Sequence, residues 1–457
     1  MAAFVGTLRS GAWLTRERMR LVALAMLIAG LLGAAFVIAT SDGLNDRFGR
    51  PLGTDFSDVY AAGTYVLEGK AAAPFDPPQQ YAREQAIFGA ATQFYGWHYP
   101  PFFLGLAALL ATMPYWLALL VWQGVSFALY LLAIRSVLAL PLASAAGGGS
   151  RAESARGGVN DEETRSPPPG PLRSPTSPLQ GEVKTEWLLL AAACPAVFVN
   201  LGHGQNGFLT AALIAAALVQ LDRRPILSGV LIALLAYKPQ FGLLIPLVLA
   251  VSGRWRTFFS AAVTVAALTL AVTLLFGSEV WSAFLASMHF TRAVVLEQGE
   301  TGWHKIQSVF SAVRMWGGGV ALAYAAQIAV TLLIAAALAW LWRGRAAFPL
   351  KAAALMVGTV LATPYSLDYD LVLLAPAIAF LAADGFSRGF APWEKTILAA
   401  LWIVPLITRS VAQATLIPLA VPLMLAAFGL IVFKAKIPFQ VVSEQARPRL
   451  KSETLKT

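Results

Sequence analysis

The sequence predicts an all-α polytopic membrane protein. Of its 457 residues, 58% are hydrophobic and only 13% are charged, whereas soluble domains carry about 25% charged residues. The apolar residues form long runs and the charged residues lie between them, which is typical of a chain that crosses a bilayer many times. An ordinary soluble enzyme is therefore excluded. Nucleic acid is not an expected partner despite the net charge of +10, because the basic residues form no patch interleaved with aromatic residues.

Residues 21–39 form the first predicted membrane helix. This run of nineteen uncharged residues follows Arg16, Arg18 and Arg20, and at about 1.5 Å per residue it spans about 30 Å, the thickness of a hydrocarbon core. A cleaved signal peptide is the competing interpretation. Its apolar region is usually about 7–15 residues long, and here many further apolar runs follow, so we interpret 21–39 as a membrane helix.

Twelve further apolar runs follow. They are 101–113, 115–140, 187–199, 207–221, 225–237, 239–252, 257–276, 317–342, 349–363, 367–383, 395–410 and 413–433. Several are short or interrupted by Pro or Gly, and broken helices persist in a membrane only where protein or a watery cavity satisfies the backbone. We therefore expect a bundle of about 11 to 13 transmembrane helices around a polar cavity.

Charge predicts the orientation of the bundle. Eleven basic residues lie in short connectors: Arg223, Arg224, Arg254, Arg256, Arg343, Arg345, Lys351, Arg388, Lys395, Lys434 and Lys436. These connectors should face the cytoplasm, since short cytoplasmic loops are enriched in Lys and Arg. Residues 41–100 instead hold seven acids against four bases. We place this loop, and residues 277–306, on the opposite face.

The predicted organisation has five parts. They are a cytoplasmic N-terminus (1–20), residues 21–140 with the outer loop 40–100, a disordered linker (141–186), the remaining bundle (187–433) with the outer loop 277–306, and a cytoplasmic tail (434–457). The linker is rich in Gly and Pro and has few large apolar residues, so it cannot offset the entropy of ordering. If both 101–113 and 115–140 crossed, the linker would lie outside. The basic connectors place it inside, so we expect one of the two segments to be re-entrant.

The first outer loop is rich in polar and aromatic residues. Asp55 and Asp58 open a predicted amphipathic helix over 57–69 that also carries Tyr60, and the loop ends with His98 and Tyr99. An aspartate there is either a helix N-cap or a carboxylate that accepts a proton from a hydroxyl substrate.

Three further polar clusters interrupt apolar runs. His203 and Gln205 lie in the segment 200–207, Lys238 precedes a proline, and Asp370 opens the run at 367–383. The structural interpretations are a tight turn at 200–207 and a lysine that reaches the interface at Lys238. The helix dipole would explain the neighbouring Asp368 but explains Asp370 less well. The functional interpretations are contacts to sugar hydroxyls or phosphate for the first two clusters and proton transfer or substrate contact for Asp370. A lipid phosphate could be bound by a group of residues that includes Lys238, Arg292, His304, Lys305 and Arg314, with Gln307 among them.

The histidines and the cysteine bear on metal sites. All four histidines (His98, His203, His289 and His304) fall in segments predicted on the outer face. No spacing among them defines a metal site, so no cofactor is assigned and a divalent metal stays an open alternative. The single cysteine, Cys194, excludes a disulfide or a multi-cysteine zinc site within the chain.

In this order, these clusters resemble glycosyltransferase family 87, a group of bacterial membrane enzymes of the GT-C class. The resemblance covers about residues 20–435 without the linker, and the residues that carry it are Asp55, Phe56, Tyr60, Ala62, Gly63, Phe75, Asp76, Tyr99, Pro100, Pro101, Gly204, Gln205, Lys238, Pro239, Gln240, Gln307, Ser308, Thr363 and Pro364. Two features depart from the family pattern: Asp58 stands where an apolar residue is usual, and Asn206 follows Gln205 without an intervening residue.

The resemblance implies a GT-C-like bundle and a polyprenyl-phosphate-sugar-dependent transferase, often specific for mannose, with Asp55 as the catalytic aspartate. The expected partners are the polyprenyl-phosphate sugar donor, a lipid or glycan acceptor and membrane lipids, and the expected location is the bacterial inner membrane with the active site facing the periplasm. The absence of a G-x-x-x-x-G-K-[ST] loop agrees with a donor that is not a nucleotide. Two alternatives remain at this point: a transporter or flippase, and a glycan ligase or polymerase that uses diphosphate-linked donors.

Overall fold

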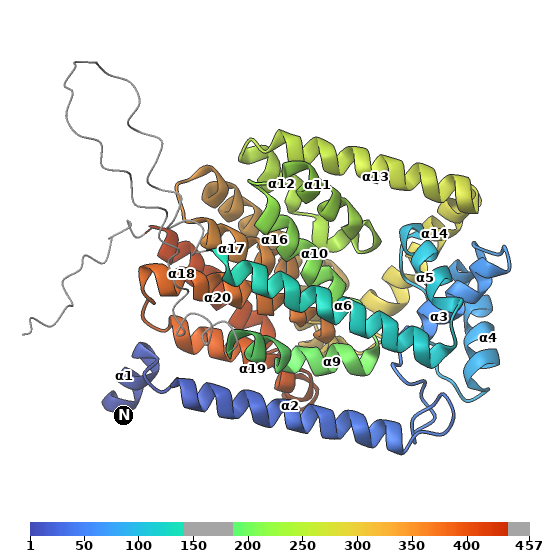
Figure 1. The fold of residues 1–457 in the computed structure, drawn as a ribbon, viewed down its shortest axis with the longest axis horizontal. Coiled ribbons are helices and arrows are strands. Elements are labelled where there is room, and N and C mark those ends of the chain that lie inside the picture. Colours follow the sequence, from blue (N-terminus) through green and yellow to red (C-terminus); the bar gives the residue numbers. More distant parts are fainter. Residues whose placement is uncertain (141–185, 437–457) are drawn as a thin grey trace, which may run out of the picture.

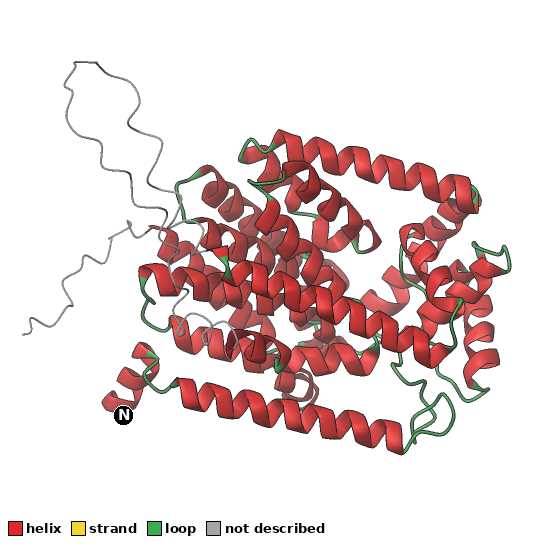
Figure 2. Ribbon diagram, viewed as in Figure 1, coloured by secondary structure: helices red, strands yellow, loops and turns green. Residues whose placement is uncertain are grey.

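The computed structural model describes residues 1–140 and 186–436, and within these ranges every regular element is a helix (Figures 1 and 2). The predicted all-α polytopic membrane fold is confirmed by this helix content and by the long apolar helices described below. Of the predicted disordered linker (141–186) and cytoplasmic tail (434–457), residues 141–185 and 437–457 lie outside the described residues.

The helices follow one another along the chain with few long connections. The α-helices are α1 (Ala2–Ser10), α2 (Arg16–Ala39), α3 (Phe56–Leu67), α4 (Pro77–Phe88), α5 (Leu104–Ala111), α6 (Tyr115–Leu138), α9 (Pro195–His203), α10 (Gly207–Gln220), α11 (Pro225–Ala233), α12 (Ile245–Val251), α13 (Trp255–Phe276), α14 (Glu279–Phe290), α15 (Val309–Met315), α16 (Val320–Arg343), α17 (Phe348–Ala362), α18 (Leu374–Arg388), α19 (Glu394–Thr415) and α20 (Ala420–Lys436). Shorter turns include the π-helical η5 (Thr291–Glu297) and the 3-10 helices η2 (Pro101–Phe103), η3 (Leu234–Tyr237), η4 (Pro239–Gly242), η6 (Trp303–Lys305) and η7 (Asp368–Leu373).

Six helices of the described part are long and apolar enough to cross a membrane. They are Arg16–Ala39, Tyr115–Leu138, Trp255–Phe276, Val320–Arg343, Asp368–Arg388 and Glu394–Thr415. The bent pair Glu186–Ala192 and Pro195–His203 raises the number to seven. Five shorter apolar helices correspond to the runs predicted near 101–113, 207–221, 225–237, 239–252 and 349–363. Six or seven of the described helices are thus long enough to cross, and the prediction of about 11 to 13 spans is reached only if helices shorter than 18 residues are counted too.

The segment 101–113 does not form a full crossing. Its helix α5 has eight residues, so its length is about 12 Å, less than half of a hydrocarbon core. The helix packs on α3, and the two backbones approach each other closely at Gly63 and Ala107. A Cβ at Gly63 would lie only 2.1 Å from the carbonyl oxygen of Ala107, so a larger residue does not fit there. Figure 1 shows α3, α4, α5 and α14 gathered at one end of the molecule, with α1 at the other.

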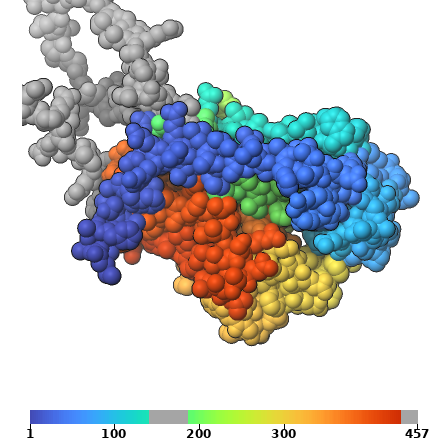
Figure 3. Space-filling view, turned by 90° about the horizontal axis from the view of Figure 1, so that it is seen from below, coloured from blue at the N-terminus to red at the C-terminus, as the bar shows by residue number. Residues whose placement is uncertain are grey.

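Burial distinguishes the centre of the bundle from its rim. In the most apolar stretch of the span formed by η7 and α18, 89% of the residues are buried. Every residue of α17 from Ala352 to Ala362 is buried as well. In contrast, only 6% of the α2 span is buried, and α2 lies on the outside of the bundle (Figures 1 and 3). The central pair is rich in Ala and Gly, and such small side chains allow close helix packing in membranes.

Charged side chains join α18, α19 and α20 at the end of the bundle opposite to α3. Lys434 lies 2.7 Å from Glu394 and 2.8 Å from Asp384, and all three side chains are almost completely buried. Lys434 was predicted as a basic connector residue. In the structure its charge balances two buried carboxylates, so removing this lysine would leave buried charges without compensation.

Candidate active site

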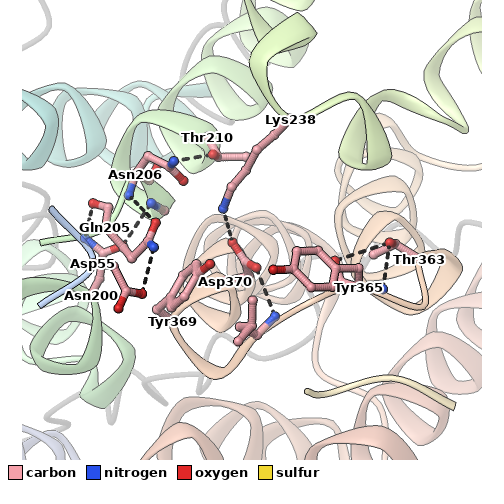
Figure 4. Close-up of polar contacts among 12 residues, drawn as sticks. Asp55, Asn200, Gln205, Asn206, Thr210, Lys238, Thr363, Tyr365, Tyr369 and Asp370 are labelled. Atoms are coloured by element: carbon pink, nitrogen blue, oxygen red, sulfur yellow. Dashed lines mark hydrogen bonds and ion pairs between the residues drawn. The ribbon is translucent and has the colours of Figure 1, made fainter. Parts of the chain in front are cut away.

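Asp55 lies where the first outer loop meets the membrane bundle. It directly precedes α3 but makes no side-chain cap to that helix. Its carboxylate instead accepts a hydrogen bond from Gln205 Nε2 at 2.8 Å and lies 3.6 Å from His203 Nδ1 (Figure 4). The N-cap interpretation of Asp55 is therefore wrong, and the carboxylate is held by residues that lie about 150 positions later in the chain.

A tight turn after α9 brings Gln205 to Asp55. Gly204 has a φ of 62°, and a Cβ at this position would lie 2.6 Å from Phe56 Cβ, so only glycine fits here without strain. Trp122 Nε1 donates to the carbonyl of Gly204 at 3.0 Å, while Gln123 and Asn200 both donate to the carbonyl of Gln205. The glycine and amides that predicted a tight turn do form one, and the turn presents the Gln205 side chain to Asp55.

The orientation of the Gln205 amide is fixed by its other contacts. Its Oε1 accepts hydrogen bonds from the Tyr99 hydroxyl at 3.0 Å and from the Asn206 backbone N–H at 3.3 Å. Since Oε1 is occupied by donors, the Nε2 group must face the Asp55 carboxylate. Tyr99 and Gln205, both predicted as site residues, thus act together in holding Asp55.

The electrostatic surroundings keep Asp55 ionised. Burial alone raises the pKa of the Asp55 carboxyl, but contacts with His203 and Gln205 and the charge of Lys305 outweigh burial and hold this pKa below its usual value. An ionised carboxylate can accept a proton. Asp55 therefore has the charge state that a general base requires at neutral pH.

The turn that carries Lys305 is tied to α19 by hydrogen bonds. The backbone N–H of Gln307 donates to Ser366 at 2.6 Å, and Thr408 of α19 donates to Gln307 Oε1 at 2.9 Å. These bonds tie the turn that carries His304 and Lys305 to α19, which carries Arg409.

Arg409 is partly exposed and pairs with the buried Asp368 at 3.2 Å. The side chain of Lys305 makes no ion pair or hydrogen bond within residues 1–140 and 186–436, and burial followed by the charge of Arg409 lowers its pKa. Its charge also acts on Asp55 and Asp368. Burial, Arg409 and Lys305 likewise lower the pKa of His304. We call Lys305 and Arg409 the cation cluster, with His304 beside it. Because the two like charges repel each other, an anionic ligand between them would be favoured.

Lys238 and Asp370, both predicted as site residues, form a buried ion pair at 2.7 Å. Lys238 also lies 4.8 Å from the ring of Tyr369, which in turn lies 6.2 Å from the ring of His203. Figure 4 shows the pair on the far side of Tyr369 from Asp55. Asp370 thus already balances the charge of Lys238, which was predicted to bind a lipid phosphate.

Two of the predicted cations are engaged elsewhere. Arg292 is 60% exposed and lies 3.4 Å from Glu297. Arg314 donates to the backbone carbonyls of Gly318 and Glu297 and lies over the ring of Trp303. Neither contact connects these arginines to Asp55.

The remaining predicted residues lie around the site. Tyr60 donates to the carbonyl of Met113 at 2.9 Å and joins α3 to the start of α6. His98 contacts Thr291 at 2.9 Å, and burial lowers the pKa of His98 to about 4, so it is neutral. Asp58 is buried, and burial together with Glu84 and Asp55 raises the pKa of its carboxyl well above the usual range.

Arg409 and its contact with Asp368 were not predicted as part of a site. After Lys395 at its start, Arg409 is the one charge in the apolar run 395–410, and an ionisable residue within a membrane segment is by itself a reason to suspect function. No group of three or more His, Cys, Asp or Glu that could hold a metal occurs in the part of the chain that the structure describes.

Comparison with known proteins identifies one family. The model of glycosyltransferase family 87 matches residues 97–364, more than half of the chain. The matched region includes Tyr99, the Gly204 turn, Lys238 and the loop with Lys305, but it begins after Asp55 and ends before Arg409. No curated protein and no solved structure matches the chain.

Proposed function

The chain belongs to glycosyltransferase family 87, and from this premise we propose that it transfers a single sugar, mannose or a similar hexose, from a polyprenyl-phosphate donor to a lipid or glycan acceptor. Asp55 is the proposed catalytic base. The transfer takes place on the outer, periplasmic face of the bacterial inner membrane, at the end of the bundle that carries α3 and α4.

One observation carries this proposal: an ionised carboxylate and a group of cations face the same site. Asp55 is held as a carboxylate by Gln205 and His203, while the charge of Lys305 acts on it from the loop before α15. A glycosyl transfer from a phosphate donor needs both a base for the acceptor hydroxyl and positive charge for the departing phosphate.

The chemistry follows from these charges. The acceptor oxygen attacks the anomeric carbon of the donor sugar, and the bond from that carbon to the phosphate oxygen breaks. Asp55 takes the hydroxyl proton, and the leaving polyprenyl phosphate takes the bonding electron pair. One such displacement inverts the anomeric configuration. The cation cluster stabilises the new phosphate charge, so no general acid is needed to protonate the leaving group.

Of the cations predicted from sequence to bind phosphate, Lys305 supports a phosphate donor more directly than Lys238, Arg292 and Arg314 do, and Arg409 joins it. The side chain of Lys305 has no partner among the described residues, and Arg409 keeps about a third of its side chain exposed while pairing with Asp368. Lys238 is buried against Asp370, and Arg292 and Arg314 are engaged in other contacts. We therefore assign phosphate binding to Lys305 and Arg409, with His304 beside them and Asp368 orienting Arg409.

The short α5 supports the proposed sidedness. If α5 does not cross, α2 and α6 carry the chain out and back, and α6 ends on the side of the N-terminus. Continuing the alternation places the basic connectors on this side and the turns at Gly204 and residues 363–368 on the other. The positive-inside rule then makes the Asp55 side periplasmic.

Labelled donors provide the test. Membranes that contain the protein would be incubated with polyprenyl-phosphate mannose, glucose or arabinose, each labelled in the sugar. We expect label to move to a lipid or glycan with one of these donors. Transfer only from a diphosphate-linked oligosaccharide would show a ligase or polymerase instead. Counterflow of substrate into proteoliposomes without a covalent product would show a transporter, and either result would overturn the proposal.

A further inference from the structure

Glu84 is a buried acid that the proposed reaction does not use. It lies on α4 in the first outer loop, its side chain is fully buried, and it forms no ion pair with a cation among residues 1–140 and 186–436. Burying a carboxylate without a cation is costly unless hydrogen bonds replace its water shell. Burial of the Glu84 carboxylate therefore needs a reason other than packing.

The three hydrogen-bond partners of Glu84 are all donors. Its Oε2 accepts from the backbone N–H of Tyr95 at 3.0 Å, and its Oε1 accepts from the backbone N–H of Gly96 at 3.1 Å. The side chain of Gln80 donates to the same Oε1 at 3.2 Å. An ionised carboxylate can accept all three of these hydrogen bonds.

The segment held by Glu84 leads directly to the catalytic carboxylate. Gly96, with a φ of 72°, turns the chain so that Tyr99 enters the site three residues later. The Tyr99 hydroxyl donates to Gln205 Oε1, and Gln205 Nε2 donates to Asp55. A continuous series of hydrogen bonds and covalent links thus runs from Glu84 through residues 95–99 to Asp55.

We propose that Glu84 is a positioning residue: its carboxylate fixes the turn at Tyr95 and Gly96, and through Tyr99 and Gln205 it sets the position of Asp55. This inference rests on the proposed role of Asp55. It assigns Glu84 no contact with substrate, and its effect on the reaction is indirect.

The surroundings of Glu84 make this positioning sensitive to pH. Asp58 of α3 and Asp55 just before α3 act on Glu84, and Tyr95 lies on the segment that Glu84 holds. Tyr115 of α6 lies near the same two aspartates. Burial raises the pKa of Glu84 to about 7, and the charge of Asp55 contributes in the same direction. Protonation at lower pH weakens its bonds to the two backbone N–H groups, since charged acceptors make stronger hydrogen bonds.

The test compares Glu84→Gln with Glu68→Gln. Glu68 lies in the same loop, but it is exposed and paired with Arg83 and Lys70, so its variant controls for removing an acid. Transfer from labelled polyprenyl-phosphate mannose would be measured between about pH 6 and pH 8, where a group with a pKa near 7 titrates. We expect the wild type and Glu68→Gln to lose activity as the pH falls through about 7. Glu84→Gln should not show this fall in activity between about pH 8 and pH 6. Its kcat at high pH should be about tenfold below that of the wild type, with the donor KM unchanged.

Amide hydrogen exchange gives a readout that needs no substrate. At one fixed pH, the Tyr95 and Gly96 amides should exchange about tenfold faster in Glu84→Gln than in the wild type and Glu68→Gln. Unchanged exchange, or a Glu84→Gln enzyme with the wild-type rate and pH profile, would overturn the inference. Asp55→Asn measured in parallel separates the two proposals, because wild-type transfer by that variant contradicts the role of Asp55 while the exchange data still report on Glu84.

Discussion

Removing the charge of Lys305 should weaken use of the donor. At about 4 Å, a cation and a phosphate attract by about 4 kcal/mol at an effective dielectric of about 20, and by about 1 kcal/mol in water. Lys305 is partly exposed, so we take about 2 kcal/mol, which corresponds to a loss of roughly 30-fold in kcat/KM for the donor. Lys305→Ala should show this loss, and Lys305→Arg should recover most of it because the charge is kept.

The assay is transfer of labelled sugar at varied donor and varied acceptor concentrations. Lys70→Ala is the matched control, since Lys70 is an exposed cation of the outer loop that pairs with Glu68. Its kcat/KM should stay within about twofold of the wild type. If Lys305→Ala matched the wild type, or if Lys305→Arg were as impaired as Lys305→Ala, the assignment of Lys305 to phosphate binding would be refuted.

Three further predictions concern the framework of the site. Gly204→Ala places a Cβ against Phe56 at a φ of 62°, so transfer should fall by about 100-fold. Gly202→Ala, two residues earlier in α9 with open space around it, should stay near wild type in the same assay. Lys238→Met leaves Asp370 buried without its cation, so it should lower the free energy of unfolding by about 3–5 kcal/mol. In a thermal unfolding measurement, adding Asp370→Leu should recover most of this loss, and no recovery would argue against the pair. Gln205→Leu removes a hydrogen-bond donor from Asp55, which raises the pKa of that carboxyl, so transfer should fall about tenfold, and first at low pH. An unchanged pH profile would contradict the hydrogen bond between Gln205 and Asp55.

The membrane fold was predictable because apolar run length and charge are properties of the sequence itself. The spans at Arg16–Ala39 and Trp255–Phe276 fall where uncharged runs predict them. The behaviour of 101–113 was not predictable from composition alone, since α5 is as apolar as a spanning helix. Its contact with α3 through Gly63 and Ala107 depends on a loop more than forty residues earlier in the chain.

The site was predictable in residue type but only partly in pairing. Asp55 and Gln205 were both singled out, but no local pattern indicates that residues 150 positions apart form a hydrogen bond. The same limit applies to Lys238 and Asp370, whose pairing across 132 positions changes the role expected for the lysine. Arg409 was overlooked because one charge in an apolar run hardly alters its hydropathy, and its partner Asp368 belongs to another helix.

The proposed role of Asp55 is tested most directly by Asp55→Asn in a transfer assay with labelled polyprenyl-phosphate sugar. General-base assistance contributes about 10²–10⁴-fold, so this variant should lose transfer by that factor while still inserting and folding. Asp76→Asn is the control, because Asp76 caps α4 in the same loop, and it should transfer at nearly the wild-type rate. A folded Asp55→Asn protein that transfers sugar at the wild-type rate would contradict the proposed role of Asp55.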